Sequence, residues 1–366
     1  MPFADPKGME QLLIRPGCAI YYRPELRPCF QELNLPMRIP PALFIFLLWL
    51  ALPSLGGCQS HEEGGGKMES FQAQTIRPTS HQELEDFFAS HNYGWSTVLE
   101  GVPPFILETL PTDLHRVDRV IEKKHIFFLS LLPMVLLANE EISAQRAEAE
   151  DLLQRLERDG LLSPDEKTQL QGLQREYRID GDLFQDPDLR RDLLERIDVI
   201  PPSLVLAQAA TESAYGTSRF ARRANNLFGE WTFLPGTGMV PLERPEGATY
   251  EIRRFPNVAA SLHSYMRNIN THWAYRNFRH NRAQLRADGK PVRGLDLADG
   301  LERYSTRGID YVNDLREIIL TNRLSRLSGA WLRPPVAGEV GNSKGLLSSP
   351  PFSRRPHSAA VETRAD

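Results

Sequence analysis

One glutamate combines an apolar setting with a place at the end of an expected helix. The stretch LVLAQAATE ends at Glu212, and a helical period puts Leu204, Gln208 and Glu212 on one face. Burial of a lone carboxyl group disfavours its charged form. A carboxylic acid that keeps its proton near neutral pH can protonate the leaving oxygen of a glycosidic bond. The alternative is a helix-end carboxylate that pairs with Arg219 or Arg222.

The rest of the sequence excludes several other kinds of site. The three cysteines are Cys18, Cys29 and Cys58, so a disulfide framework, a thiolate metal site and a cysteine nucleophile are excluded after residue 58. HExxH, Walker and GxGxxG motifs do not occur. The 43 basic and 47 acidic residues give a net charge of −4, which argues against a nucleic-acid-binding protein. We therefore expect carboxylate and tyrosine chemistry without a metal or cofactor.

Three short motifs follow one another in the second half of the chain. Residues 212–216 read ESAYG, residues 226–229 read NLFG, and Tyr304-Ser305-Thr306 is followed by Tyr311. In this order they resemble the motifs E-S-x-aromatic-G, N-L-F-G and Y-A-T then Y of the peptidoglycan glucosaminidase family. Each motif alone is weak, and the ordered set is what carries the resemblance.

Two further stretches narrow the resemblance to one branch. Residues 132–142 (LPMVLLANEEI) and 268–275 (NINTHWAY) are similar to the Bax-like branch, which is bacterial and unrelated to the apoptotic regulator of that name. The resemblance covers about residues 75–328. It implies a mainly α protein, in which an α-helical N-terminal region precedes a lysozyme-like α domain with a small β lobe.

The resemblance also implies an activity and the residues that carry it. The implied activity is hydrolysis of the β-1,4 bond after N-acetylglucosamine in peptidoglycan, with Glu212 as the general acid. Tyr304 corresponds to an active-site tyrosine that orients the N-acetyl group or a water molecule. The implied substrate-binding residues are Tyr215, Asn226, Phe228 and Tyr311, and the aromatic rings of Tyr215 and Phe228 are expected to line the cleft.

A second carboxylate is expected from the β lobe. Glu243, Glu246 and Glu251 are candidates, and we favour Glu251 because it lies in a strand-like stretch and therefore on a rigid element. The alternative is an exposed strand residue beside Arg253. The chain departs from the family pattern at Arg307-Gly308, where Asp-Pro is common, and at Glu230, where an apolar residue is usual.

Other polar residues have simpler interpretations. We expect His272 to be structural, and Glu140 and Glu141 to cap or pair within the helical half. The cluster of Arg219, Arg222 and Arg223 is either a solvated face or a contact for anionic peptide stems. Residues 213–280 hold nine arginines and four glutamates, a local surplus that suits an anionic polymer.

The first 58 residues resemble a targeting sequence. Residues 42–55 form an apolar run of about 14 residues, short for a membrane span of about 20. Leu55-Gly56-Gly57-Cys58 resembles a bacterial lipobox, in which the cysteine is lipidated and becomes the mature N-terminus; residues 1–36 would then be an untranslated upstream extension. Gln59 then implies the periplasmic face of the outer membrane. The alternative is a plain signal peptide and a periplasmic or secreted protein.

The rest of the chain divides by composition and pattern. After the upstream extension and signal peptide (1–58) we expect a tether (59–74), a helical N-terminal region (75–198), the lysozyme-like domain (199–332) and a disordered tail (333–366).

Within the helical region, Ser80 is expected to cap a helix over 81–90, with Glu83 completing a capping box. Residues 113–159 are expected to hold two or more helices, kinked or broken at Pro133.

Two other functions fit the same residues. A lytic transglycosylase shares the lysozyme-like fold and needs only one glutamate. A non-catalytic wall-binding lipoprotein keeps the fold without the chemistry, although it has no use for a desolvated acid such as Glu212. The products of peptidoglycan digestion distinguish the three.

Overall fold

The computed structural model describes residues 73–242, 244 and 247–334. The lipobox at Cys58 and the candidates Glu243 and Glu246 lie outside the described residues, as do most of the expected tether and tail. Two of these expected boundaries change. Gln74 already belongs to a strand, and the backbone N–H of Arg333 donates to the carbonyl of Val102 at 2.8 Å, so ordered structure begins before residue 75 and continues past residue 332.

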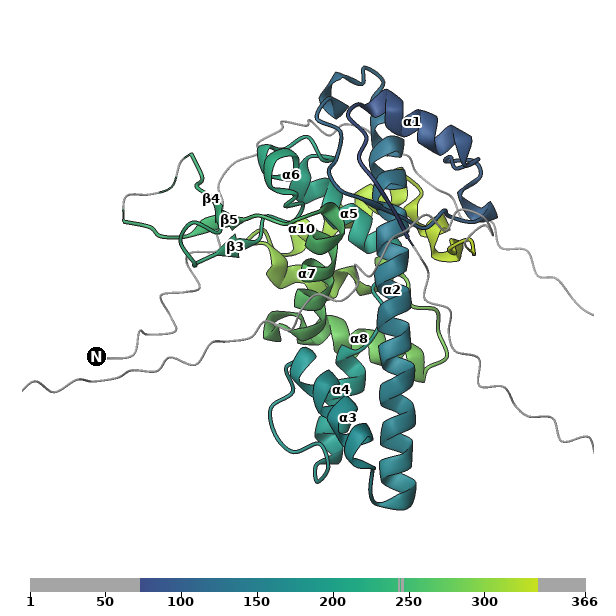
Figure 1. Cartoon of the computed structure of the whole chain (residues 1–366), viewed down its shortest axis with the longest axis vertical. Helices are drawn as coiled ribbons and strands as arrows, with labels where there is room; N and C mark the ends of the chain where they lie inside the picture. The colour runs from purple at the N-terminus through teal and green to yellow at the C-terminus, as the bar shows by residue number, and fades with distance from the viewer. Residues whose placement is uncertain (1–72, 243, 245–246, 335–366) are drawn as a thin grey trace, which may run out of the picture. The chain divides into compact units, whose positions relative to one another are not determined.

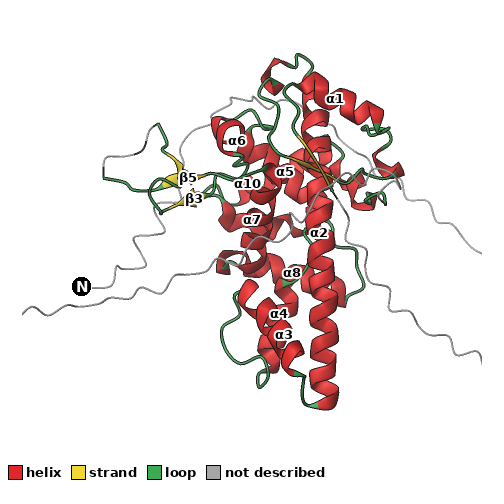
Figure 2. Ribbon diagram, viewed as in Figure 1, coloured by secondary structure: helices red, strands yellow, loops and turns green. Residues whose placement is uncertain are grey.

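The described chain is mainly α, as predicted, with two small sheets (Figures 1 and 2). The helices are α1 (His81–Ser90), α2 (Val120–Asp159), α3 (Pro164–Glu176), α4 (Pro187–Arg196), α5 (Pro202–Ser213), α6 (Arg219–Ala224), α7 (Val258–Thr271), α8 (Arg276–Ala287), α9 (Gly294–Leu297) and α10 (Ile309–Thr321). The strands are β1 (Gln74–Ile76), β2 (Phe105–Leu107), β3 (Trp231–Thr232), β4 (Gly238–Met239) and β5 (Glu251–Arg253). Short 3₁₀ helices include Trp273–Tyr275, Ala298–Tyr304 and Leu324–Gly329.

The long helix α2 is unbroken, contrary to the expected break at Pro133. A proline cannot donate to the carbonyl four residues earlier, which here belongs to Leu129. The hydroxyl of Tyr93 donates to that carbonyl at 2.9 Å and replaces the missing bond. The helix continues because a residue outside it supplies the lost donor.

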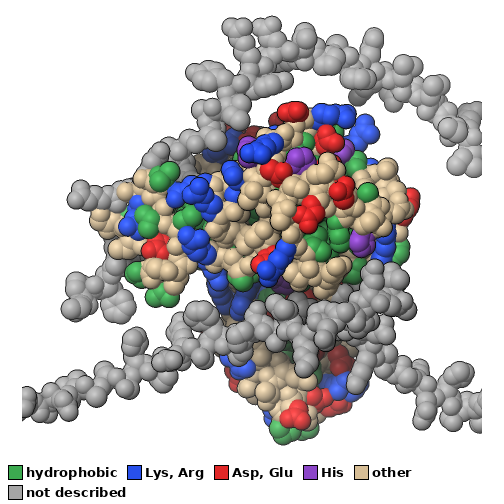
Figure 3. All heavy atoms as spheres, turned by 45° about the horizontal axis from the view of Figure 1, so that its top comes forward, with side chains coloured by type: hydrophobic (Ala, Val, Ile, Leu, Met, Phe, Trp, Pro, Cys, Tyr) green, Lys and Arg blue, Asp and Glu red, His purple; other side chains and the backbone are tan. Residues whose placement is uncertain are grey.

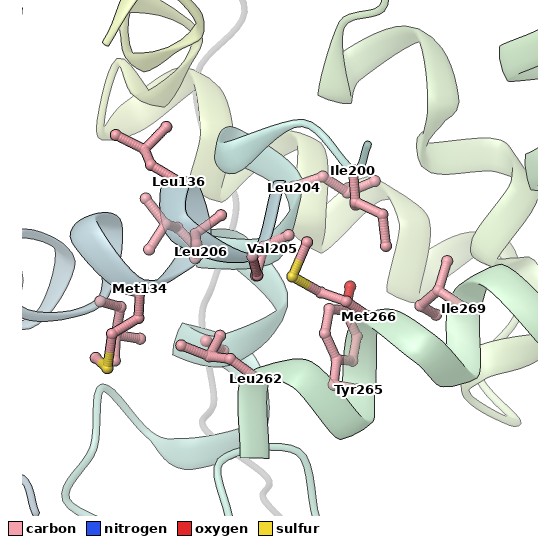
Figure 4. Close-up of a cluster of buried hydrophobic side chains, with 14 of the residues drawn as sticks. Met134, Leu136, Ile200, Leu204, Val205, Leu206, Leu262, Tyr265, Met266 and Ile269 are labelled. Atoms are coloured by element: carbon pink, nitrogen blue, oxygen red, sulfur yellow. The ribbon is translucent and has the colours of Figure 1, made fainter. Parts of the chain in front are cut away.

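Helix α2 is a core helix. It is long and apolar enough to cross a membrane, but 72% of its most apolar window is buried inside the protein. It packs against α5 and α7. Figure 4 shows Met134 and Leu136 of α2 near Leu206 of α5 and Leu262 of α7, in one cluster of buried apolar side chains. This cluster holds α5, the helix that carries Glu212.

Capping residues explain where several helices begin. Ser80 caps α1 as predicted, by accepting from the backbone N–H of Glu83 at 3.2 Å. The capping box is not closed, because the carboxylate of Glu83 bonds to Thr79 rather than to the backbone N–H of Ser80. A complete capping box starts α3 at Ser163, and Asp186 caps α4.

The small β lobe joins three short strands in the order β3-β5-β4, all antiparallel. Strand β4 approaches β5 so closely that a Cβ on Gly238 would lie 2.5 Å from the carbonyl oxygen of Ile252. Only glycine fits there. The backbone N–H groups of Gly236 and Gly238 donate to the two carboxylate oxygens of Glu251 at 3.0 and 2.7 Å. These bonds hold the start of β4 to β5.

Candidate active site

A one-way chain of hydrogen bonds ends on Glu212. The hydroxyl of Tyr265 donates to Gln208 Oε1, Gln208 Nε2 donates to the hydroxyl of Tyr311 at 3.0 Å, and that hydroxyl donates to Glu212 Oε1 at 2.9 Å. Gln208 and Tyr311 are buried, and Glu212 is half-buried. The predicted shared face of Gln208 and Glu212 is confirmed, because both side chains contact Tyr311. Tyr311 thus holds the carboxyl group of Glu212 through Oε1.

The turn after α5 ends the helix directly behind Glu212. Ala214, Tyr215 and Gly216 all have left-handed backbones, with φ of 50°, 55° and 76°. The helix cap is therefore Ala214. Glycine is favoured at 216 because its φ is 76° and because a Cβ there would lie 2.8 Å from Leu110 Cδ1 and 3.1 Å from the ring of Phe127. Each left-handed non-glycine residue costs about 1 kcal/mol or more, so packing must hold this turn in place.

Aromatic rings surround the carboxyl group. The rings of Tyr304 and Tyr311 are stacked, with centroids 5.5 Å apart, and Tyr275 lies 6.0 Å from Tyr304. Burial, and then the charge of Glu212, raise the pKa of Tyr304 and of Tyr311 well above the usual tyrosine value. Both hydroxyls therefore keep their protons and act as hydrogen-bond donors rather than bases.

The NLFG loop packs behind this cluster. The hydroxyl of Tyr304 donates to the carbonyl of Phe228 at 3.4 Å, and the ring of Phe228 stacks on Tyr265 at 3.9 Å. Asn226 donates both amide hydrogens to the carbonyls of Glu230 and Arg253. Both side chains are buried and position this loop, and their assignment as substrate-binding residues stays a prediction.

Two predicted residues make their contacts in other places. The ring of Tyr215 lies 5.8 Å from both Phe127 and Phe128 of α2, and its place in the cleft wall stays a prediction. The carboxylate of Glu251 is buried and holds the two glycine N–H groups of the lobe, which lower its pKa. These bonds give Glu251 a structural role, and its assignment as the second carboxylate stays a prediction.

Glu230, which was not among the predicted site residues, also lies at this cluster. Glu230 Oε2 accepts from Ser264 Oγ at 2.7 Å and lies 3.4 Å from Arg253 Nη1, whereas Oε1 is buried and has no hydrogen-bond partner among the described residues. Burial raises the pKa of Glu230. The charges of Glu212 and Glu230 both raise the pKa of Tyr275, after its burial, so both carboxyl groups lie near that ring. The one signal in the sequence was that Glu230 departs from the family pattern.

His272 has a structural role, and the described residues form no cluster of metal ligands. His272 Nδ1 accepts from the backbone N–H of Ala274 at 3.3 Å and caps a 3₁₀ helix, and burial lowers its pKa. Over residues 73–242, 244 and 247–334, no three His, Cys, Asp or Glu side chains come together as metal ligands.

The Glucosaminidase family model, described as mannosyl-glycoprotein endo-beta-N-acetylglucosaminidase, matches residues 188–324, which include Glu212, Glu230, Tyr304 and Tyr311. Protein bax of Escherichia coli (strain K12) is 34% identical over 205 residues, which are 56% of this chain and 71% of that protein. No solved structure matches the chain.

Proposed function

Because the chain belongs to the Bax-like glucosaminidase family, we propose that it is a peptidoglycan hydrolase that cleaves the β-1,4 bond after N-acetylglucosamine. In this proposal Glu212 is the general acid. The observation that carries it is the hydrogen-bond chain from Tyr265 through Gln208 and Tyr311 to the carboxyl group of Glu212. A buried chain that ends on one oxygen of a half-buried acid fixes the direction from which the proton is given.

The chemistry of the leaving step follows from this arrangement. Glu212 donates its proton to the glycosidic oxygen as the bond to the anomeric carbon breaks, and the sugar develops positive charge. The ring stack of Tyr304 on Tyr311 keeps Tyr311 in place while the charge of Glu212 changes. The hydroxyl of Tyr304 donates its hydrogen to the carbonyl of Phe228, so its oxygen can orient the N-acetyl group or a water molecule only by accepting a hydrogen bond from it.

The other half of the reaction needs a group on the opposite face of the sugar. A carboxylate base separated from the acid by about 6.5–9.5 Å gives inversion, and a carboxylate nucleophile at about 5–5.5 Å gives retention. The N-acetyl group of the substrate can also replace the nucleophile. The proposal requires one of these routes and depends on Glu212 in all of them.

The test is digestion of purified peptidoglycan sacculi, followed by mass spectrometry of the fragments. The proposal expects reducing N-acetylglucosamine ends. Anhydro-muramic ends would instead show a lytic transglycosylase. Intact sacculi after incubation with freshly purified, folded protein would show a non-catalytic wall-binding protein.

We also propose that the protein is a lipoprotein anchored through Cys58 on the periplasmic face of the outer membrane. The support is the lipobox-like sequence Leu55–Cys58 with Gln59 after it. Labelling of cells with a radioactive fatty acid tests this: the label should enter the wild-type chain and be lost in Cys58→Ser. A labelled Cys58→Ser variant, or an unlabelled wild type, would show that the lipobox is incidental.

A further inference from the structure

Three arginines of helix α6 line one hollow of the surface. Arg219, Arg222, Arg223 and Leu242 line an open depression of about 410 Å³, which we call the arginine hollow. Arg219 lies three and four residues before the other two, so the three side chains share one face of the helix. On the face shown in Figure 3, Lys and Arg side chains gather over the part of the molecule that holds α6 and the β lobe.

Among the described residues, no neighbouring acid balances the charge of this hollow. Within the part of the chain that the structure describes, no Asp or Glu lies within ion-pair distance of Arg219, Arg222 or Arg223, whereas many other arginines are paired. A further cation lies close by, because Arg254 Nη1 donates to the carbonyl of Arg223 at 3.0 Å. Like charges on one helix face repel each other, and a bound anion relieves that repulsion.

The arginine hollow is tied to the active site at both ends of α6. The helix begins at Ser218, whose backbone N–H donates to the carbonyl of Ser213, the residue after Glu212. It ends at Asn225, next to the loop in which Phe228 accepts from Tyr304. A ligand in the hollow therefore lies on the same short segment that joins the acid to its aromatic neighbours.

We propose that the arginine hollow binds the carboxylate groups of the peptide stems that peptidoglycan strands carry. This inference rests on the proposed function, because it assigns a second part of the same substrate. The planar guanidinium fork matches a carboxylate and forms charge-assisted, often bidentate hydrogen bonds. Leu242 is 83% exposed and offers an apolar contact to the aliphatic part of a stem. The hollow thus distinguishes a stem-bearing strand from a bare glycan.

The test compares two polymers and two double variants. The polymers are glycan strands with stems, and the same strands after an amidase has removed the stems. Arg222→Gln/Arg223→Gln changes two exposed side chains of the hollow. Arg158→Gln/Arg191→Gln is the matched control, because these side chains are 71% and 68% exposed and lie on α2 and α4. The measured quantity is the ratio of kcat/KM on stem-bearing strands to kcat/KM on stripped strands.

The expected result is a ratio about ten-fold lower in the hollow variant, from two contacts worth about three-fold each, and unchanged in the control. An unchanged ratio in the hollow variant overturns the inference. Binding is measured separately by co-sedimentation of Glu212→Gln protein with both polymers, where the hollow variant should lose its preference for stem-bearing strands.

This second measurement separates the two proposals. If the wild type cleaves neither polymer, the proposed activity fails, and the co-sedimentation still tests the hollow. If the hollow variant keeps its preference for stems but loses binding to phosphatidylglycerol vesicles, the hollow is a lipid site and the inference is wrong.

Discussion

The hydroxyl of Tyr311 donates to Oε1 of Glu212 at 2.9 Å, although the two residues lie 99 positions apart in the sequence. The same hydroxyl accepts from Gln208, which lies one helical turn before Glu212 on α5. Tyr311 of α10 thus holds the carboxyl group of Glu212 and also bonds to Gln208, which lies beside Glu212 on the same face of α5. The precision of this site depends on the packing of α5 against α10.

The first prediction concerns that bond. Tyr311→Phe removes the donor to Glu212 and leaves the buried Gln208 amide without its acceptor. We expect kcat on peptidoglycan to fall about 10- to 100-fold and the free energy of unfolding to fall by about 1–3 kcal/mol. Kinetics on soluble glycan fragments and urea unfolding measure the two effects.

The matched control for this variant is Tyr177→Phe. Tyr177 is buried and its hydroxyl donates to Gln145 in the helical N-terminal region, at 2.5 Å. It should lose a comparable amount of stability without a change in kcat. Equal kcat values for Tyr311→Phe and wild type would show that the hydrogen-bond chain does not position the acid.

The second prediction isolates the proton of Glu212. Glu212→Gln keeps the shape and the acceptor for Tyr311 but has no acid proton. We expect activity to fall by about 10³-fold or more while the melting temperature changes by no more than about 2 °C. Assay of fragment release, with calorimetry on the same samples, checks both. Persistent activity would mean that another group is the acid.

The sequence predicted those features that depend on local chemistry. Ser80 starts its helix as expected, because a cap acts on N–H groups only two or three residues away. The structure brings residues of the first and third motifs together, because Tyr311 bonds to Glu212 and stacks on Tyr304, and their catalytic roles stay predictions.

Features that depend on distant partners were missed. Arg279 and Arg282 on α8 are almost fully buried, although arginine is usually exposed. Arg282 donates to the carbonyls of Glu195, Asp198 and Val199, more than 80 positions away. The break expected at Pro133 failed for the same reason, because Tyr93, which repairs the helix, lies 36 positions before Leu129.

The third prediction tests that repair. Tyr93→Phe leaves the Leu129 carbonyl buried without a donor, and we expect a loss of about 1–2 kcal/mol in the free energy of unfolding. Pro133→Ala supplies a backbone N–H to the same carbonyl. In the Pro133→Ala background, Tyr93→Phe should therefore lower the free energy of unfolding by about 1 kcal/mol less than it does in the wild type, as measured in a double-mutant cycle. Simple additivity of the two changes would show that the tyrosine does not replace the missing helix bond.

The last prediction follows from the raised pKa of Glu230. Burial disfavours its charged form, so the folded protein still binds a proton at pH values where the unfolded chain has released it. Because the folded state holds more protons over this range, stability falls as pH rises from the usual pKa of about 4.5 to the raised one, and stays lower above it. Arg253 and Ser264 reduce this cost without removing it.

Glu230→Gln removes the charge and keeps an acceptor for Ser264. We expect the variant to match wild type near pH 4, where both side chains are neutral, and to exceed it by about 1 kcal/mol near pH 7.5. Urea unfolding at the two pH values measures the difference. Glu148→Gln, at an exposed position on α2, is the control and should show no such pH dependence. A Glu230→Gln variant that is less stable than wild type at pH 7.5 would show that the charged carboxylate is stabilised by Arg253 more than burial disfavours it.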